Sequence, residues 1–177
     1  MSIKPLPLLW LHGPPGVGKT SVGWEIYTRL GGEGVAVAYL DADQLGLCLP
    51  APAGDPAGHR LKARNLGALL PVYRSGGVRC VVLSGVAESP AVVRTYAERL
   101  RHATLTLCRL RADGDTLRRR FLGRGRLTNR VDEAVRMAAT LDAAGFPGTC
   151  VDTTGRSITE VAQQVRQQTG DWPGAGR

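Results

Sequence analysis

A glycine-rich run near the start of the chain constrains its fold more than any other feature. The run fits the pattern G-x-x-x-x-G-K-[ST], and it consists of Gly13, Pro14, Pro15, Gly16, Val17, Gly18, Lys19 and Thr20. The apolar segment 6–12 before it is typical of a buried strand, and the segment from Ser21 to Leu30 is typical of a helix. Strand, glycine loop and helix in this order predict an α/β fold with a parallel sheet.

The residue types in this run suit the binding of phosphate groups. The glycines let the backbone turn tightly and bring its N–H groups to phosphate oxygens, while the following helix directs its positive end at the same anions. We expect Lys19 to reach the β- and γ-phosphates and the Thr20 hydroxyl to ligate Mg²⁺. The predicted nucleotide-binding loop continues into the helix at Ser21, and it resembles the Walker A motif of P-loop NTPases.

Two carboxylates follow the next predicted strand, 35–40. They are Asp41 and Asp43, and in parallel sheets ligands bind at the carboxyl ends of the strands. One of them could accept the proton of a substrate hydroxyl or hold a water molecule of Mg²⁺. Asp43 could equally begin a short helix as its N-cap. We predict Asp41 as base and metal ligand and Asp43 as a substrate-binding residue.

The predicted third strand, 78–83, is followed by Ser84 instead of an acid. Many P-loop proteins hold Mg²⁺ through an Asp at the end of a neighbouring strand. Its absence at this position argues against motor-type and AAA+ ATPases. It shifts the predicted support of the metal to Asp41 or Asp43.

A predicted helix, 58–74, carries two further candidates for substrate binding. They are Arg60 and Asn65, and the helix follows a Pro/Gly-rich loop, 49–56. The alternative for Arg60 is a solvated basic face shared with Arg64, and the alternative for Asn65 is a tolerated position at the edge of the apolar stripe.

An arginine-rich segment, 117–126, is predicted to be a helix end that enters a flexible basic lid. Arg120 and Arg124 are one helical turn apart and share a face. A lid of this kind can close over transferring phosphates, exclude water and stabilise the charge of the transition state. The alternatives are an RNA-binding patch and a plain surface cluster.

Composition bounds the remaining choices. The chain has 177 residues, of which 43% are hydrophobic and 21% charged, as in an ordinary globular protein. We expect one domain over 1–170 and a flexible tail over 171–177. The net charge of +8 leaves nucleic acid as an unlikely but open partner. No apolar run reaches the length of about 18 residues that spans a membrane, so we expect a cytoplasmic protein. The four cysteines lack metal-site spacing, and we expect them to be free thiols. We expect a monomer or a homodimer.

Taken together, these motifs resemble the small-molecule kinase branch of the P-loop superfamily, which includes nucleoside monophosphate, shikimate, gluconate, adenylylsulfate and chloramphenicol kinases. The resemblance rests on the loop, the carboxylates after the second strand, the basic lid and the closing segment 151–161, VDTTGRSITEV. It implies a five-stranded parallel sheet with helices on both faces, and transfer of the γ-phosphate of ATP, with Mg²⁺, to a hydroxyl of a small molecule. It further implies that Arg120 and the turn Thr154-Gly155 lie beside adenine, and that Arg124 faces the phosphates and acts in catalysis.

The lid can be tested by a substitution that keeps its charge. We expect Arg124→Lys to lower kcat of phosphoryl transfer at least tenfold, about 1.4 kcal/mol, because a point charge cannot replace a bidentate guanidinium. Full activity in this variant would show that Arg124 is only a surface charge. RNA binding, by contrast, should be unchanged in Arg124→Lys and should lose part of its salt dependence when Arg118, Arg124 and Arg126 are removed together.

Overall fold

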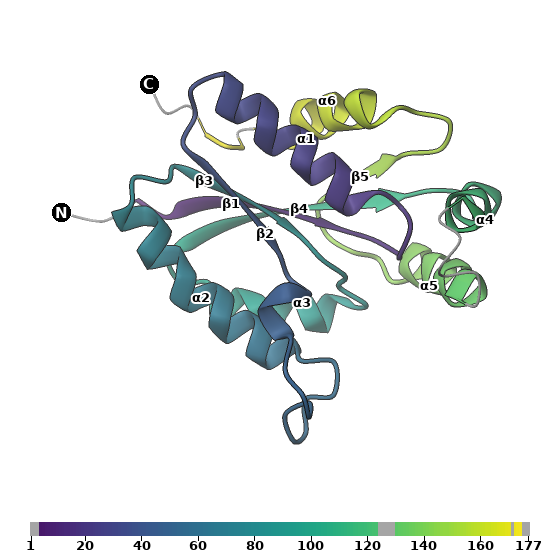
Figure 1. Ribbon diagram of the computed structural model, residues 1–177, viewed down its shortest axis with the longest axis horizontal. Helices are drawn as coiled ribbons and strands as arrows, with labels where there is room; N and C mark the ends of the chain where they lie inside the picture. The colour runs from purple at the N-terminus through teal and green to yellow at the C-terminus, as the bar shows by residue number, and fades with distance from the viewer. Residues whose placement is uncertain (1–3, 124–129, 171, 175–177) are drawn as a thin grey trace.

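A five-stranded parallel sheet forms the centre of the molecule, as predicted (Figure 1). The computed structural model describes residues 4–123, 130–170 and 172–174. The strand order is β2-β3-β1-β4-β5, and each neighbouring pair is parallel. The strands are β1 (Leu6–His12), β2 (Val37–Asp41), β3 (Cys80–Ser84), β4 (Ala103–Arg111) and β5 (Thr149–Asp152).

Helices cover both faces of the sheet (Figure 1). They are α1 (Lys19–Gly32), α2 (His59–Ser75), α3 (Pro90–Ala97), α4 (Gly114–Leu122), α5 (Val131–Ala143) and α6 (Ile158–Gln168), with a short 3-10 turn η1 (Gln44–Gly46) after β2. The helices α1 and α6 lie on one face, α2 and α3 lie on the other, and α4 and α5 pack together beyond β4 and β5 (Figure 1).

The alternation of side chains along β1 explains why both faces are covered. Leu9 and Leu11 point into the apolar layer under α1 and α6, whereas Leu8 and Trp10 point into the layer under α2 and α3. Successive side chains of a strand point to opposite faces, so a strand that is buried on both faces is apolar throughout. β1 is therefore the central strand, and its carboxyl end is the fixed point from which the glycine loop starts.

Some helix ends follow directly from the sequence. Ser157 and Glu160 form the predicted capping box at α6, with Ser157 N donating to Glu160 Oε2 at 2.8 Å and Glu160 N to Ser157 Oγ at 3.2 Å. Pro90 is the first residue of α3, and Ser89 caps the helix. α1 begins at Lys19, two residues earlier than expected, because the helix starts directly after Gly18, which has φ 107°.

Trp172 belongs to the apolar layer under α1 and α6, although it lies in the segment that we expected to be a flexible tail. Its side chain is 6% exposed, so this residue packs against the body of the protein. All four cysteines are free thiols; Cys80 and Cys108 are buried, and Cys48 and Cys150 are exposed. In the part of the chain that the structure describes, no helix has the length and apolar character needed to cross a membrane.

The glycine loop passes so close to α4 that it has no room for a side chain at its centre. Gly16 has φ 80°, and a Cβ there would lie 2.5 Å from Cε2 of Phe121. Phe121 is itself buried, at 2% exposure, and cannot move away cheaply. Glycine is thus required at this position both by the backbone conformation and by the neighbouring ring.

A pair of glycine substitutions tests this constraint. Gly16→Ala should lower the free energy of unfolding by about 2 kcal/mol or more, because a left-handed conformation costs about 1–2 kcal/mol and the ring contact adds to it. Gly31→Ala in α1, where a Cβ meets nothing within 4 Å, should leave stability unchanged or raise it by roughly 0.5 kcal/mol. Urea unfolding of both variants makes the comparison, and equal stabilities would contradict the close packing at Gly16.

His12 ends β1 directly before the loop and is completely buried. Its ring packs on Phe146, with the ring centroids 4.5 Å apart. Burial, and after it the nearby charge of Arg109, lower the pKa of His12 from 6.5 to about 4. The imidazole is therefore neutral in the folded protein at neutral pH.

Acidification should destabilise the fold through this histidine. Between pH 6.5 and pH 4 the ring takes up a proton in the unfolded chain but not in the folded one, so the proton favours unfolding. From this residue alone we expect the free energy of unfolding to be about 2 kcal/mol lower at pH 5 than at pH 7. His12→Leu should lose that difference in urea unfolding, and His102→Leu, on an exposed histidine, should keep it. The same pH dependence in His12→Leu and the native chain would contradict the assignment.

Candidate functional site

The predicted phosphate loop joins the carboxyl end of β1 to the start of α1. Gly13, Gly16 and Gly18 all have positive φ, at 146°, 80° and 107°. Gly18 is the N-cap of α1, no side chain caps the first turn, and this turn contains no acidic residue. The backbone N–H groups and the positive end of the helix dipole thus suit an anion at this position.

Lys19 lies on the loop that it follows. Its Nζ donates to the carbonyl oxygens of Gly13 and Pro14, each at 3.0 Å. These contacts hold the ammonium group against the backbone of the loop. The phosphate-binding role of Lys19 stays a prediction.

The ends of β2 and β3 bring a carboxylate and two hydroxyl groups together. Asp41 is paired in register with Ser84, whose Oγ donates to Asp41 Oδ2 at 3.4 Å. The other carboxylate oxygen, Oδ1, accepts the backbone N–H of Asp43 at 2.9 Å. The hydroxyl of Tyr39 lies 2.7 Å from Ser84 Oγ. Asp41 is therefore held in place on both oxygens.

Tyr39 stays a neutral phenol in this group. Burial raises its pKa, the hydrogen bond with Ser84 opposes that rise, and the negative charge of Asp41 adds to it, so that the net shift is upward. Thr20 also lies within hydrogen-bonding reach of Tyr39. Tyr39 thus connects the second strand to the phosphate loop.

Five predicted residues line one pocket of about 340 Å³: Pro15, Lys19, Thr20, Asp41 and Asp43. Residues that the sequence did not single out for this site complete it. They are Gly85, Val86, Glu88, Arg130, Glu133 and Met137, together with Ser84 at the end of β3. Ser84 and the residues after it could have been found from the rule that ligands bind at the carboxyl ends of strands. No local pattern indicated Arg130, Glu133 or Met137.

Arg60 and Asn65 support the chain after β2 and are absent from the lining of this pocket. Arg60 donates to the carbonyl oxygen of Gly54. Asn65 Nδ2 donates to the carbonyl oxygen of Leu45 at 2.7 Å. Their substrate-binding role stays a prediction.

A second pocket of about 520 Å³ lies on the other side of the loop. The phosphate loop contributes Gly16, Val17, Gly18 and Ser21 to it, and the remaining lining residues are Val22, Arg120, Gly123, Thr153, Arg156, Ser157, Ile158 and Val161. Arg120 donates to Val17 O, Thr153 Oγ1 and Thr153 O, each at 2.9 Å. It therefore ties the loop to the end of β5.

The predicted turn Thr154-Gly155 lies between two residues of this lining, Thr153 and Arg156. Thr154 N donates to Asp152 Oδ1 at 2.8 Å, and Gly155 has φ 66°. These contacts shape the turn that follows β5. Arg124, the predicted catalytic residue of the lid, lies outside the described residues, so the lid and its arginine remain predictions.

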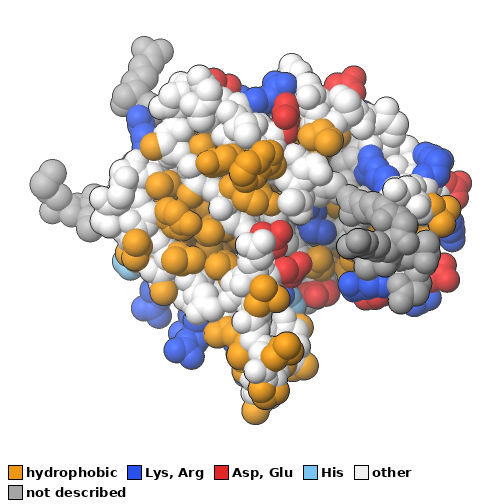
Figure 2. Space-filling model, viewed as in Figure 1, with side chains coloured by type: hydrophobic (Ala, Val, Ile, Leu, Met, Phe, Trp, Pro, Cys, Tyr) orange, Lys and Arg blue, Asp and Glu red, His pale blue; other side chains and the backbone are white. Residues whose placement is uncertain are grey.

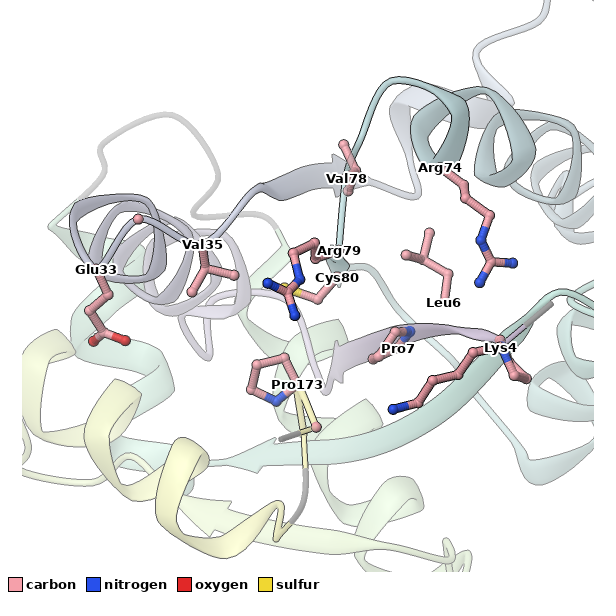
Figure 3. A pocket seen from close by; sticks show the side chains of 13 residues that line it. Lys4, Leu6, Pro7, Glu33, Val35, Arg74, Val78, Arg79, Cys80 and Pro173 are labelled. Atoms are coloured by element: carbon pink, nitrogen blue, oxygen red, sulfur yellow. The ribbon is translucent and has the colours of Figure 1, made fainter. Parts of the chain in front are cut away.

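A third pocket, of about 480 Å³, opens at the opposite end of the sheet (Figure 3). Leu6 and Cys80, at the amino ends of β1 and β3, line it together with the cationic side chains of Lys4, Arg74 and Arg79. Ligands of parallel sheets bind at the carboxyl edge, which in this protein is the edge with the glycine loop. The two pockets beside the loop are therefore the candidate site.

The residues of the 340 Å³ pocket suit a Mg²⁺ ion. Thr20, Asp41 and Ser84 offer hydroxyl and carboxylate oxygens, the ligands that hard cations prefer. Within the described residues, no three His, Cys, Asp or Glu side chains form a metal cluster. Mg²⁺ at phosphate-transfer sites is usually held by one or two protein groups together with substrate phosphates and water.

Solved structures share this architecture over nearly the whole chain. The tunicamycin resistance protein of Deinococcus radiodurans is 25% identical, with 93% of this chain and 96% of that chain covered and a TM-score of 0.70. A gluconokinase from Sinorhizobium meliloti 1021 is 18% identical, with 94% and 93% covered and a TM-score of 0.66. Shikimate kinase from Acinetobacter baumannii is 18% identical, with 92% of each chain covered and a TM-score of 0.56.

Comparison of the sequence with protein-family models and with curated proteins finds no match. The structural neighbours share the overall fold of this chain, with its five-stranded parallel sheet flanked by helices. The chain therefore has the fold of the P-loop small-molecule kinases.

Proposed function

We propose that the protein is a kinase that transfers the γ-phosphate of ATP to a hydroxyl group of a small molecule, with Mg²⁺ as cofactor. The observation that carries this proposal is one shared pocket: Lys19 and Thr20 of the phosphate loop line it together with the carboxylate of Asp41. A phosphate-binding lysine and a fixed carboxylate on one cavity are the groups that phosphoryl transfer to an alcohol requires.

In this proposal, each of the two pockets binds a different substrate. The 520 Å³ pocket, with Arg120 and the residues around Thr153, takes the nucleoside of ATP. Its phosphates follow the loop toward Lys19, and the acceptor enters the 340 Å³ pocket. The loop lines both cavities, so the γ-phosphate arrives where the acceptor is held.

Asp41 acts as the base in this reaction. Its carboxylate takes the proton of the acceptor hydroxyl while the hydroxyl oxygen forms a bond to the γ-phosphorus, and the bond to the β-phosphate oxygen breaks to release ADP. Ser84 and the backbone of Asp43 orient the carboxylate. Lys19 stabilises the charge on the phosphates.

Thr20 and Asp41 would hold the Mg²⁺ ion in this pocket. When bound, the ion neutralises charge on the β- and γ-phosphate oxygens. The acceptor itself is a small hydroxyl-bearing metabolite or an antibiotic-like compound. The tunicamycin resistance protein among the structural neighbours supports including tunicamycin among the candidates.

A pair of conservative substitutions tests the proposed base, once an acceptor has been found by ADP release. Asp41→Asn should lower kcat by about 10²- to 10⁴-fold and leave ATP affinity little changed, because the amide keeps the shape but takes up no proton. Asp43→Asn, in the same pocket, should have a smaller effect. The reverse order would assign the base to Asp43.

Lys19→Ala tests the role of the phosphate loop. We expect it to cost several kcal/mol in nucleotide binding or turnover, on the scale of electrostatic transition-state effects. An unchanged rate of ADP release in Lys19→Ala would overturn the kinase proposal.

A further inference from the structure

Carboxylates from three separate elements line the proposed acceptor pocket. Asp41 is the last residue of β2 and Asp43 follows that strand, Glu88 lies between β3 and α3, and Glu133 lies in α5. Figure 2 shows acidic side chains gathered on this face, beside the apolar protrusion that the segment between β2 and α2 forms. The fold, and not proximity in sequence, therefore places these carboxylates on one pocket.

Glu88 is fixed in the pocket wall by a histidine. Its Oε2 lies 2.8 Å from Nε2 of His59, the first residue of α2, whose ring packs edge-on against the buried Tyr96 with ring centroids 6.1 Å apart. The Glu88 side chain is still 44% exposed, so it is held from one side and open to the pocket. Partial burial raises its pKa, but the hydrogen bond from His59, a backbone hydrogen bond and the nearby charge of Lys62 together lower it by more, and the net shift is downward. Glu88 is therefore a charged hydrogen-bond acceptor at neutral pH.

Two other carboxylates are oriented by basic partners. Asp43 Oδ1 accepts from Lys62 Nζ at 3.0 Å, and the Asp43 side chain remains 64% exposed. Both oxygens of Glu133 accept from Arg130, at 3.0 and 3.2 Å. Arg130 is thereby engaged in a bidentate pair, whereas Glu88 and Asp43 keep acceptor capacity toward the cavity.

We propose that Glu88 and Asp43 bind hydrogen-bond donors of the acceptor, so that the acceptor is a polyhydroxy or amine-bearing alcohol, such as an amino sugar, and not an acid. This inference rests on the proposed kinase function and specifies its substrate class. A hydroxyl or ammonium group can donate to both carboxylates. The carboxylate of an acidic acceptor would lie beside the negative charges of Glu88 and Asp43, which disfavours its binding.

The substrate class can be tested with a panel of acceptors and Mg-ATP, with ADP release as the measurement. The neutral members are glucose, uridine and tunicamycin, the amine-bearing members are glucosamine and kanamycin, and the acidic members are gluconate and shikimate. We expect kcat/KM to be highest for a neutral or amine-bearing compound. Highest activity with an acidic compound would overturn the inference and leave the kinase proposal intact.

Binding of Mg-ATP to the protein, measured by titration calorimetry, distinguishes a wrong substrate class from a wrong proposed function. If the protein binds Mg-ATP but turns over no neutral or amine-bearing compound, the inferred substrate class is wrong. If it binds no Mg-ATP, the proposed function itself fails.

Glu88→Gln tests the positioning role of the carboxylate. With the best acceptor of the panel, we expect KM of the acceptor to rise about 10- to 100-fold, as for loss of a charge-assisted hydrogen bond, with KM of ATP unchanged. The matched control is Glu98→Gln on an exposed glutamate at the end of α3, which should change neither KM. A change of less than twofold in the acceptor KM of Glu88→Gln would overturn the proposal.

His59→Gln keeps a side-chain N–H donor toward Glu88 and provides a second test. It should raise the acceptor KM less than Glu88→Gln does, again without effect on KM of ATP. A rise in both KM values would show that the pair only maintains the fold around α2.

Discussion

The guanidinium group of Arg120 holds the glycine loop against the carboxyl edge of the sheet. It donates to the carbonyl oxygen of Val17 in the loop and to two oxygen atoms of Thr153 at the end of β5. The next residue of α4, Phe121, packs its ring under Gly16. Two consecutive residues of one helix thus fix the loop from outside, one by directional hydrogen bonds and the other by a close apolar contact.

The position of the loop determines what the neighbouring strand ends can do. Asp41 is useful to a bound phosphate only if the loop keeps Lys19 and Thr20 on the same cavity. Ser84 and Tyr39 extend this arrangement from the loop across β2 and β3. The geometry of the candidate site therefore depends on contacts made on both sides of β1, and not on the loop sequence alone.

Much of this arrangement could be predicted because it follows local rules. The loop pattern, the apolar strands and the capping box of α6 depend on residues near one another in sequence. The position of Asp41 beside the loop could be predicted because parallel strands end at one edge, a rule that links distant strands without knowledge of their side-chain contacts.

The rest depends on contacts that no local pattern encodes. Glu88 reaches the pocket because His59, far from it in sequence, holds it from behind. Arg130 and Glu133 lie on the pocket because α5 packs there. Likewise, no local pattern showed that the guanidinium group of Arg60 donates to the carbonyl group of Gly54. Composition alone cannot distinguish a side chain that binds the backbone from one that binds a ligand.

The two cavities differ in the elements that line them as well as in position. Both pockets share the glycine loop and the start of α1. The remaining walls of the 520 Å³ pocket come from α4, from α6 and from the segment between β5 and α6, whereas those of the 340 Å³ pocket come from the ends of β2 and β3, the segments after them and α5. Mutations in the segments after β2 and β3 can therefore reshape one cavity without disturbing the other. During evolution, a scaffold of this kind can change the ligand of one pocket and keep the ligand of the other.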